Sequence, residues 1–290
     1  GLGGRMRRTA LLLWGALLIL SGCSAELPDD PYQSYVDQPV KSLSGMLFRG
    51  TAIEKEELGE PVEDRSALTM YYGFLRSLES GEVKKTRYST QSLYEAIAYT
   101  AVEIVFATRD DGNLMMTYRQ RQPLVFWYYP EADYYDGECY YYKHNGDWFV
   151  DTYNRHAKDV EPDALGIPSD IISQYRITES EVYRRPDGGY QVYVYAESRS
   201  DQDRTAQVIG VTDEEGMFSY IEATLVYPDS GDKDSGGEKE PVITEKYIIE
   251  YSRINEVVEV EPPATLTQEE MEYLQQEYRN AQTQRGENQK

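Results

Sequence analysis

The chain has 290 residues, enough for one large domain or two small ones, and 40% of them are hydrophobic. Its 51 acidic residues outnumber its 29 basic ones, which gives a formal net charge of -22. Because nucleic-acid binding needs a basic surface that displaces counterions from phosphates, we expect no nucleic-acid partner. Tyrosine accounts for 27 residues. Since tyrosine is enriched in strands, the composition favours a mainly β protein.

The N-terminus has the layout of a secretion signal. Arg5, Arg7 and Arg8 stand before an uncharged apolar run over residues 10–20. That run is shorter than the roughly 20 residues needed to span a bilayer. A basic segment followed by a short apolar one is typical of a signal peptide. We therefore expect residues 1–22 to be removed.

The apolar run ends in Leu20-Ser21-Gly22-Cys23. These residues resemble the lipobox of bacterial lipoproteins, in which an aliphatic and two small residues precede a cysteine. The resemblance implies cleavage between Gly22 and Cys23, diacylglycerol on the Cys23 sulfur and, usually, acylation of the new amino group. The alternatives are an ordinary signal peptide, or an uncleaved N-terminal helix with a chance cysteine. In the lipoprotein interpretation, several acyl chains anchor the protein to the cell membrane.

The segment after the lipobox has the composition of a tether. Residues 24–40 contain three prolines and three aspartates with little periodicity, so we expect residues 23–40 to be a lipidated linker on the extracytoplasmic side. The sequence leaves open whether the membrane is an inner or an outer one. Cys139 is the one cysteine besides Cys23, so a lipidated chain has no internal disulfide.

The body of the chain begins with a predicted helix over residues 66–80. Its apolar side chains recur at helical spacing, and Asp64 or Ser66 can cap its start; they are Leu68, Tyr71, Tyr72, Leu75 and Leu78. Residues 90–99 are compatible with a short helix or with the lead into a strand.

Short strands are predicted from residue 100 onward. Asp110-Asp111-Gly112 and Asn145-Gly146 are hairpin turn signals. They separate predicted strands at 100–109, 113–121, 138–144 and 147–153, with a further strand at 124–129. One or two short helices are expected over 162–176.

Strands are expected again after this helical break. They fall at residues 177–185, 190–198, 206–211, 217–227 and 242–254, with a last short strand at 257–261. The acidic, glycine-rich residues 229–241 predict a mobile hairpin loop. Thr267 and Glu270 form a capping-box pattern. It predicts a C-terminal helix followed by a polar tail after residue 281. We expect residues 41–265 to form a single β-rich domain, and 266–290 the helix and tail.

This element order predicts an α+β fold that is mainly antiparallel β, with a curled sheet or incomplete barrel and covering helices. It resembles the LolA/LppX-like group of lipoprotein-carrier and lipid-binding lipoproteins over residues 40–265. Residues 247–263, YIIEYSRINEVVEVEPP, resemble the last hairpin of that group. The alternative is a cone-shaped domain like that of the nuclear-transport-factor family, whose opening helix residues 68–83 resemble.

No set of residues predicts catalysis or a cofactor. His144 and His156 are the only histidines, too few for a histidine-rich metal site. Cys139 with His144 or His156 could be a thiol nucleophile and its base, but Lys143 is its one cationic neighbour, and a plain strand cysteine is the better interpretation. We therefore predict no catalytic, cofactor or metal residue and a protein that is not an enzyme, with a hydrolase as the alternative.

Two local patterns have simpler explanations than a site. Ser230 and Lys233 match the spacing of a nucleophilic serine and lysine, but no predicted helix positions them. The nearby Asp229, Asp232 and Asp234 are possible calcium ligands, yet no register of the loop matches an EF-hand. A solvated acidic loop accounts for both patterns.

The strongest functional signal in the body is the aromatic stretch 126–153. It predicts sheet packing or, alternatively, an aromatic-lined groove or partner patch. Three adjacent tyrosines, Tyr140 to Tyr142, must face both sides of a strand, so they cannot share one groove. The sequence favours a lipid-anchored protein that holds a lipid or other apolar ligand. The alternative is an envelope-associated structural or interaction protein without a small-molecule pocket.

Overall fold

A computed structural model describes residues 51–91, 96–121, 131–153, 164–201, 203–228 and 241–289. The predicted signal peptide, the lipobox with Cys23 and the tether lie outside these residues. So do the predicted strand at 124–129 and most of the acidic loop, with its possible calcium ligands.

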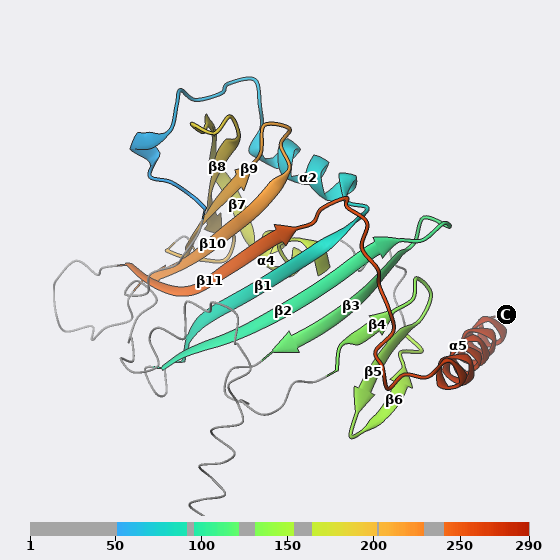
Figure 1. The fold of residues 1–290 in the computed structure, drawn as a ribbon. Helices are drawn as coiled ribbons and strands as arrows, with labels where there is room; N and C mark the ends of the chain where they lie inside the picture. Colours follow the sequence, from blue (N-terminus) through green and yellow to red (C-terminus); the bar gives the residue numbers. More distant parts are fainter. Residues whose placement is uncertain are drawn as a thin grey trace, which may run out of the picture.

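The described strands form one antiparallel sheet of eleven strands (Figure 1). Its order is β6-β5-β4-β3-β2-β1-β11-β10-β9-β8-β7. The strands are β1 (Ser80–Gln91), β2 (Ala96–Thr108), β3 (Leu114–Arg121), β4 (Asp133–Tyr135), β5 (Tyr140–His144), β6 (Asp147–Val150), β7 (Tyr175–Arg184), β8 (Tyr190–Ser198), β9 (Thr205–Thr212), β10 (Phe218–Pro228) and β11 (Pro241–Ser252).

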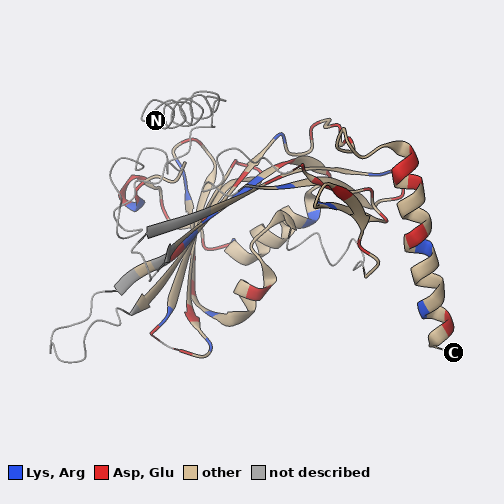
Figure 2. Ribbon diagram, turned by 90° about the horizontal axis from the view of Figure 1, so that it is seen from below, with Lys and Arg blue, Asp and Glu red and all other residues tan. Residues whose placement is uncertain are grey.

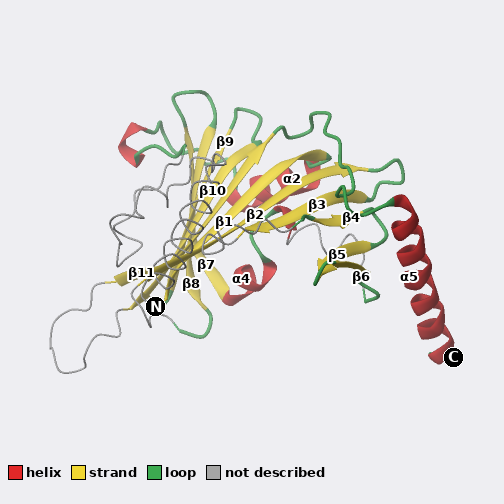
Figure 3. Cartoon of the chain, turned by 60° about the horizontal axis from the view of Figure 1, so that its bottom comes forward, coloured by secondary structure: helices red, strands yellow, loops and turns green. Residues whose placement is uncertain are grey.

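The sheet curls and stays open, because β6 and β7 are its two ends and do not pair. Two helices, α2 (Ala67–Ser77) and α4 (Ser169–Gln174), lie on one face, called the inner face here (Figures 2 and 3). Helix α5 (Gln268–Asn288) lies beside the β6 end. The predicted fold class, a curled antiparallel sheet with covering helices, is confirmed, and the cone-shaped alternative is not found.

Both predicted hairpin turns join paired strands. Asn145 and Gly146 have φ angles of 51° and 87° between β5 and β6, the left-handed values that a two-residue hairpin turn requires. Gly112, with φ of 84°, lies in the turn between β2 and β3.

The strand β1 was not predicted from the sequence. Its sequence, SGEVKKTRYSTQ, lacks an apolar alternation, yet it pairs with β2 on one side and β11 on the other. The possible short helix over 90–99 is wrong, because its ends belong to β1 and β2. Pairing with strands distant in sequence overrides the weak local preference.

The end of the chain also differs from the expectation. Residues 257–261 form no strand, and Val257 is 90% exposed, so this apolar pattern has no partner sheet among the described residues. The C-terminal helix begins with the expected Thr267 cap, whose hydroxyl accepts the Glu270 N–H at 3.2 Å. It continues to Asn288, so the predicted polar tail from residue 282 is mostly helix.

The main core lies between α2 and the inner face of the sheet. The Phe74 ring lies 4.9 Å from the Tyr251 ring and 5.3 Å from the Phe218 ring. Helix α2 buries Ala67, Tyr71 and Phe74. The buried side of α2 is therefore rotated from the predicted apolar face. Leu68 and Tyr72, which belong to the predicted face, lie at the surface.

A second core holds α5 against the opposite face of β4–β6. Its buried members are Tyr134, Cys139, Tyr141, Trp148, Val150, Leu266, Met271 and Leu274. Near the far end of α5, the Arg285 guanidinium donates to the Thr152 carbonyl at 2.5 Å. These contacts attach the helix along much of its length to the β5–β6 hairpin.

The start of the described chain lies along the edge strand β7. The Gly59 N–H donates to the Arg184 carbonyl at 2.8 Å, and the Val62 N–H donates to the Val182 carbonyl at 2.7 Å. Residues 51–62, which include a short 3-10 helix at Lys55–Glu57, thus cover the open side of β7 at its end, Val182–Arg184.

Candidate apolar pocket

An apolar pocket of about 340 Å³ lies between the inner face of β7–β10 and the two helices α2 and α4. Its floor consists of alternate side chains from three neighbouring strands, namely Val192, Val194, Ala196, Ala206, Val208, Gly210, Ile221, Ala223 and Leu225. Because alternate residues of a strand face the same side, strands with one apolar side create this floor directly.

The sequence predicts part of this floor correctly. The alternation in residues 190–198 places Val192, Val194 and Ala196 together, and the structure confirms this arrangement. The cross-strand pairing then sets Val192 opposite Gly210 and Val194 opposite Val208. Pairing of β9 with β10 adds Ile221 opposite Gly210, so the apolar side chains become one surface.

A glycine shapes one part of the pocket. A Cβ atom on Gly210 would lie 2.5 Å from Cε1 of Phe218 and 2.8 Å from Cγ2 of Val192. The bare backbone of β9 at this position therefore lets the Phe218 ring lie across it.

The rim of the pocket is apolar and open to solvent. Four large apolar side chains that line the pocket have exposed fractions between 37% and 41%; they are Leu68, Tyr72, Ile172 and Ile177. Such clustering of exposed apolar surface around a concavity is typical of a binding site. The helical spacing of Leu68 and Tyr72 places them on the predicted apolar face of the helix, and this signal does not identify their position at the rim.

Buried tyrosines hold the segment that leads into α4. The Tyr251 hydroxyl donates to the Leu165 carbonyl at 2.6 Å, and the Ile167 N–H donates to the Tyr71 hydroxyl at 2.8 Å. Burial raises the pKa of Tyr251 well above its usual value, so this phenol stays protonated as a donor. In contrast, α4 itself buries no residue.

A second hollow, of about 260 Å³, adjoins the pocket on the other side of α4. It differs in polarity because Lys85, Arg87 and Asp170 line it. The Arg87 guanidinium donates to Glu245 at 2.7 Å, and Lys85 Nζ lies 3.5 Å from the Ala164 carbonyl oxygen.

The candidate nucleophile Cys139 is fully buried immediately before β5. Burial, together with Asp136 and Glu138, raises the pKa of the Cys139 thiol to about 12. His144 lies at the exposed β5–β6 turn, and His156 lies outside the described residues. The plain structural cysteine is therefore the interpretation that the geometry supports.

The described part of the aromatic stretch packs on both faces of the sheet. Tyr135 and Tyr140 join the inner core, whereas Tyr134 and Tyr141 face α5. Tyr142 and Phe149 stack at 5.8 Å and are 37% and 42% exposed. None of the described residues in 126–153 lines the apolar pocket. The pocket is therefore not the aromatic-lined groove that this stretch could form.

Among the described residues, no three His, Cys, Asp or Glu side chains are placed to hold a metal ion. The helices within the same residues include none that is both long and apolar enough to cross a membrane.

Comparison with known proteins gives matches among solved structures. No protein-family model and no curated protein sequence matches the chain. Among solved structures, the chain is similar to LprF from Mycobacterium bovis, with 12% sequence identity and a TM-score of 0.32. The match covers 71% of this chain and 100% of the LprF chain.

Proposed function

We propose that the protein is a lipid-anchored, extracytoplasmic binding protein that holds an apolar ligand in the pocket beneath α2 and α4. The observation that carries the proposal is an open hollow with an aliphatic floor and an exposed apolar rim. Leaving Leu68, Tyr72, Ile172 and Ile177 partly in water is unfavourable, and a bound apolar molecule removes that cost.

The size of the pocket favours a slender ligand. A volume of about 340 Å³ is at the lower end of the roughly 300–1,000 Å³ of small-molecule sites. Each CH₂ group transferred from water into such a site contributes about 0.8 kcal/mol. A single acyl chain is therefore the ligand class that this pocket supports best.

The lipobox supports the anchoring part of the proposal. Acyl chains on Cys23 would hold the chain at a membrane, the source of acyl-chain ligands. An interaction protein without a small-molecule site, the alternative from the sequence, would have no use for the open hollow. The buried, protonated thiol of Cys139 likewise gives no support to a hydrolase.

Native mass spectrometry of the purified protein, beside a denatured sample, tests the proposal. We expect a discrete excess mass that disappears on denaturation and has the mass of an acyl-chain compound. A second readout is the fluorescence of dansyl-undecanoate added to full-length protein carrying Cys23→Ser, which removes acyl chains of the protein itself. Protein that is always empty and leaves this fluorescence unchanged would contradict the proposal.

The rim offers a matched pair of variants. Ile172→Glu places a charge at the pocket mouth and should weaken dansyl-undecanoate binding by at least tenfold. Phe149→Glu changes a side chain of similar exposure, 42% against 37%, that does not line the pocket, and it should leave the affinity unchanged. Equal effects of the two substitutions would indicate nonspecific adsorption.

A further inference from the structure

We infer that the ligand is a single-chain amphiphile with an anionic headgroup, with its chain in the apolar pocket and its headgroup beside Lys85 and Arg87. The inference rests on the proposed function and adds the headgroup class, the position of the headgroup and the direction in which the ligand lies.

The two hollows are adjacent and are together called the trough here. They share four lining residues, Ile167 and Ile171 from the α4 side and Ile221 and Ala223 from the sheet. On the sheet side, β10 pairs with β11 and β11 pairs with β1, so the inner face is continuous from one hollow to the next. In the inferred complex, an extended chain along the sheet passes between α4 and the small side chain of Ala223, which lines both hollows.

The polarity of the trough changes at α4. The apolar pocket has one charged lining residue, Arg199, whereas the polar hollow has Lys85, Arg87 and Asp170. A molecule that is apolar along its length and polar at one end matches this division.

Cations line the polar hollow although the chain as a whole is acidic. Two cations against one acid line it, in a protein with a formal charge of -22. Both cations are on β1, held in place by pairing on both sides. The Arg87 side chain is 51% exposed, which places the charged end of the ligand at the border with water. A carboxylate or phosphate there accepts charge-assisted hydrogen bonds.

Two acids face these cations and moderate their charge. Glu245 pairs with Arg87 at 2.7 Å, and Asp170 lies in the first turn of α4. A guanidinium has five N–H donors, and within the described residues one of those of Arg87 bonds to Glu245. Asp170 opposes an incoming anion, so Asp170→Asn should increase the affinity for a carboxylate ligand.

The opposite orientation would place the headgroup at Arg199, which makes this residue the matched control. Arg199 is exposed and directly follows the end of β8. It lines the apolar pocket but not the polar hollow. The rigid strand position of Lys85 and Arg87 favours their end of the trough.

The test compares dansyl-undecanoate with its methyl ester, which has the same chain without the charge. Fluorescence titrations use full-length protein carrying Cys23→Ser, at low and high salt. We expect the acid to bind about tenfold more tightly than the ester at low salt, and high salt to reduce this ratio. Lys85→Met and Arg87→Gln should each reduce the acid-to-ester ratio at least threefold without weakening the ester. Arg199→Gln should not change it.

The possible outcomes test the headgroup assignment separately from the proposed binding of an apolar ligand. Equal binding of acid and ester by the unsubstituted protein overturns the headgroup assignment and leaves the apolar pocket intact. If Arg199→Gln abolishes the preference for the acid over the ester and Lys85→Met does not, the headgroup lies at the Arg199 end. That result also overturns the headgroup assignment. Failure of both probes to bind contradicts the proposed function itself.

Discussion

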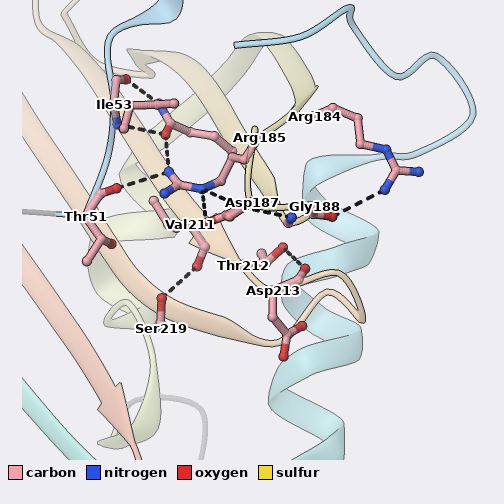
Figure 4. A network of polar contacts seen from close by, with 12 residues as sticks. Thr51, Ile53, Arg184, Arg185, Asp187, Gly188, Val211, Thr212, Asp213 and Ser219 are labelled. Carbon is pink, nitrogen blue, oxygen red and sulfur yellow. Dashed lines mark hydrogen bonds and ion pairs between the residues drawn. The ribbon is translucent and has the colours of Figure 1, made fainter. Parts of the chain in front are cut away.

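The Gln191 side chain holds Ile53 by both of its backbone polar groups. The Ile53 N–H donates to Gln191 Oε1 at 3.1 Å, and Gln191 Nε2 donates to the Ile53 carbonyl at 2.9 Å. Arg185 adds a bond to the Thr51 carbonyl at 3.0 Å, seen beside Ile53 in Figure 4. A fully buried amide thus attaches the first described residues to β8, at a separation of 138 positions in the sequence.

Gln191→Leu should detach this segment. The substitution removes both bonds to Ile53 and leaves buried polar groups without partners, which costs about 1–3 kcal/mol. Urea unfolding should show a lower midpoint, and limited proteolysis should cut faster within residues 51–62. Gln268→Leu, at an exposed position in the first turn of α5, is the control and should change neither. Unchanged proteolysis of Gln191→Leu would show that the segment is held by β7 alone.

Helix α5 should contribute to the stability of the domain. Leu274 is 4% exposed within the core on β4–β6, whereas its neighbour Tyr273 is 71% exposed. Leu274→Ala should lower the free energy of unfolding by about 2–4 kcal/mol, because it leaves a cavity. Tyr273→Ala should change it by less than about 0.5 kcal/mol. If chemical denaturation gave the same value for both variants, α5 would not be part of the cooperative unit.

Cys139 should be inert in the folded protein. Its thiol is fully buried, with its pKa raised to about 12 from about 8.5 in an unfolded chain. At mildly alkaline pH the thiolate fraction is therefore roughly a thousandfold lower in the folded state. In protein carrying Cys23→Ser, Ellman's reagent should react slowly with the native state and at once in denaturant. Rapid reaction of the native protein would place Cys139 at the surface.

Alkaline pH should unfold the protein cooperatively. Burial raises the pKa of Tyr175 to about 12 and also raises those of Tyr140, Tyr141 and Tyr220. Phenols of the unfolded chain ionise near 10. The folded state therefore retains protons that the unfolded state loses, so this stability is complete below pH ~10 and decreases above it.

Tyrosinate absorbance and circular dichroism, followed together through an alkaline titration, check this expectation. A part of the tyrosine absorbance should appear only when the β-sheet signal is lost. Ionisation of all tyrosines near pH ~10 with an intact circular dichroism spectrum would contradict it.

Local signals in the sequence predict most strands correctly. The turn residues Asn145 and Gly146 specify a hairpin by their left-handed φ angles, and alternation in β8 and β10 identifies the sides that face the pocket. Such features depend on neighbours in the sequence, so they can be recognised without a structure. Val257, which is 90% exposed, shows the limit, because an apolar pattern does not itself provide a partner strand.

The pocket itself could not be predicted, because its walls come from segments distant in sequence. Leu68 on α2, Ile172 on α4 and Ala206 on β9 meet only after the sheet has formed. The strand β1 is a similar case: Lys85 and Arg87 make it locally polar, and its pairing with β11 follows from the order of the whole sheet. The aromatic stretch, the strongest local signal, belongs to the packing of β4–β6 instead.

The way both ends of the sheet are covered has a consequence for self-association. An open sheet has two edge strands with unpaired backbone groups, and such edges recruit strands from other copies. Residues 59–62 bond to the outer edge of β7 at its last residues, Val182–Arg184, while β6 is only four residues long and packs against α5. The β6 edge and the covered end of β7 are thus poor templates for strand addition. The open sheet therefore resists growth into intermolecular β-structure at β6 and at the covered end of β7.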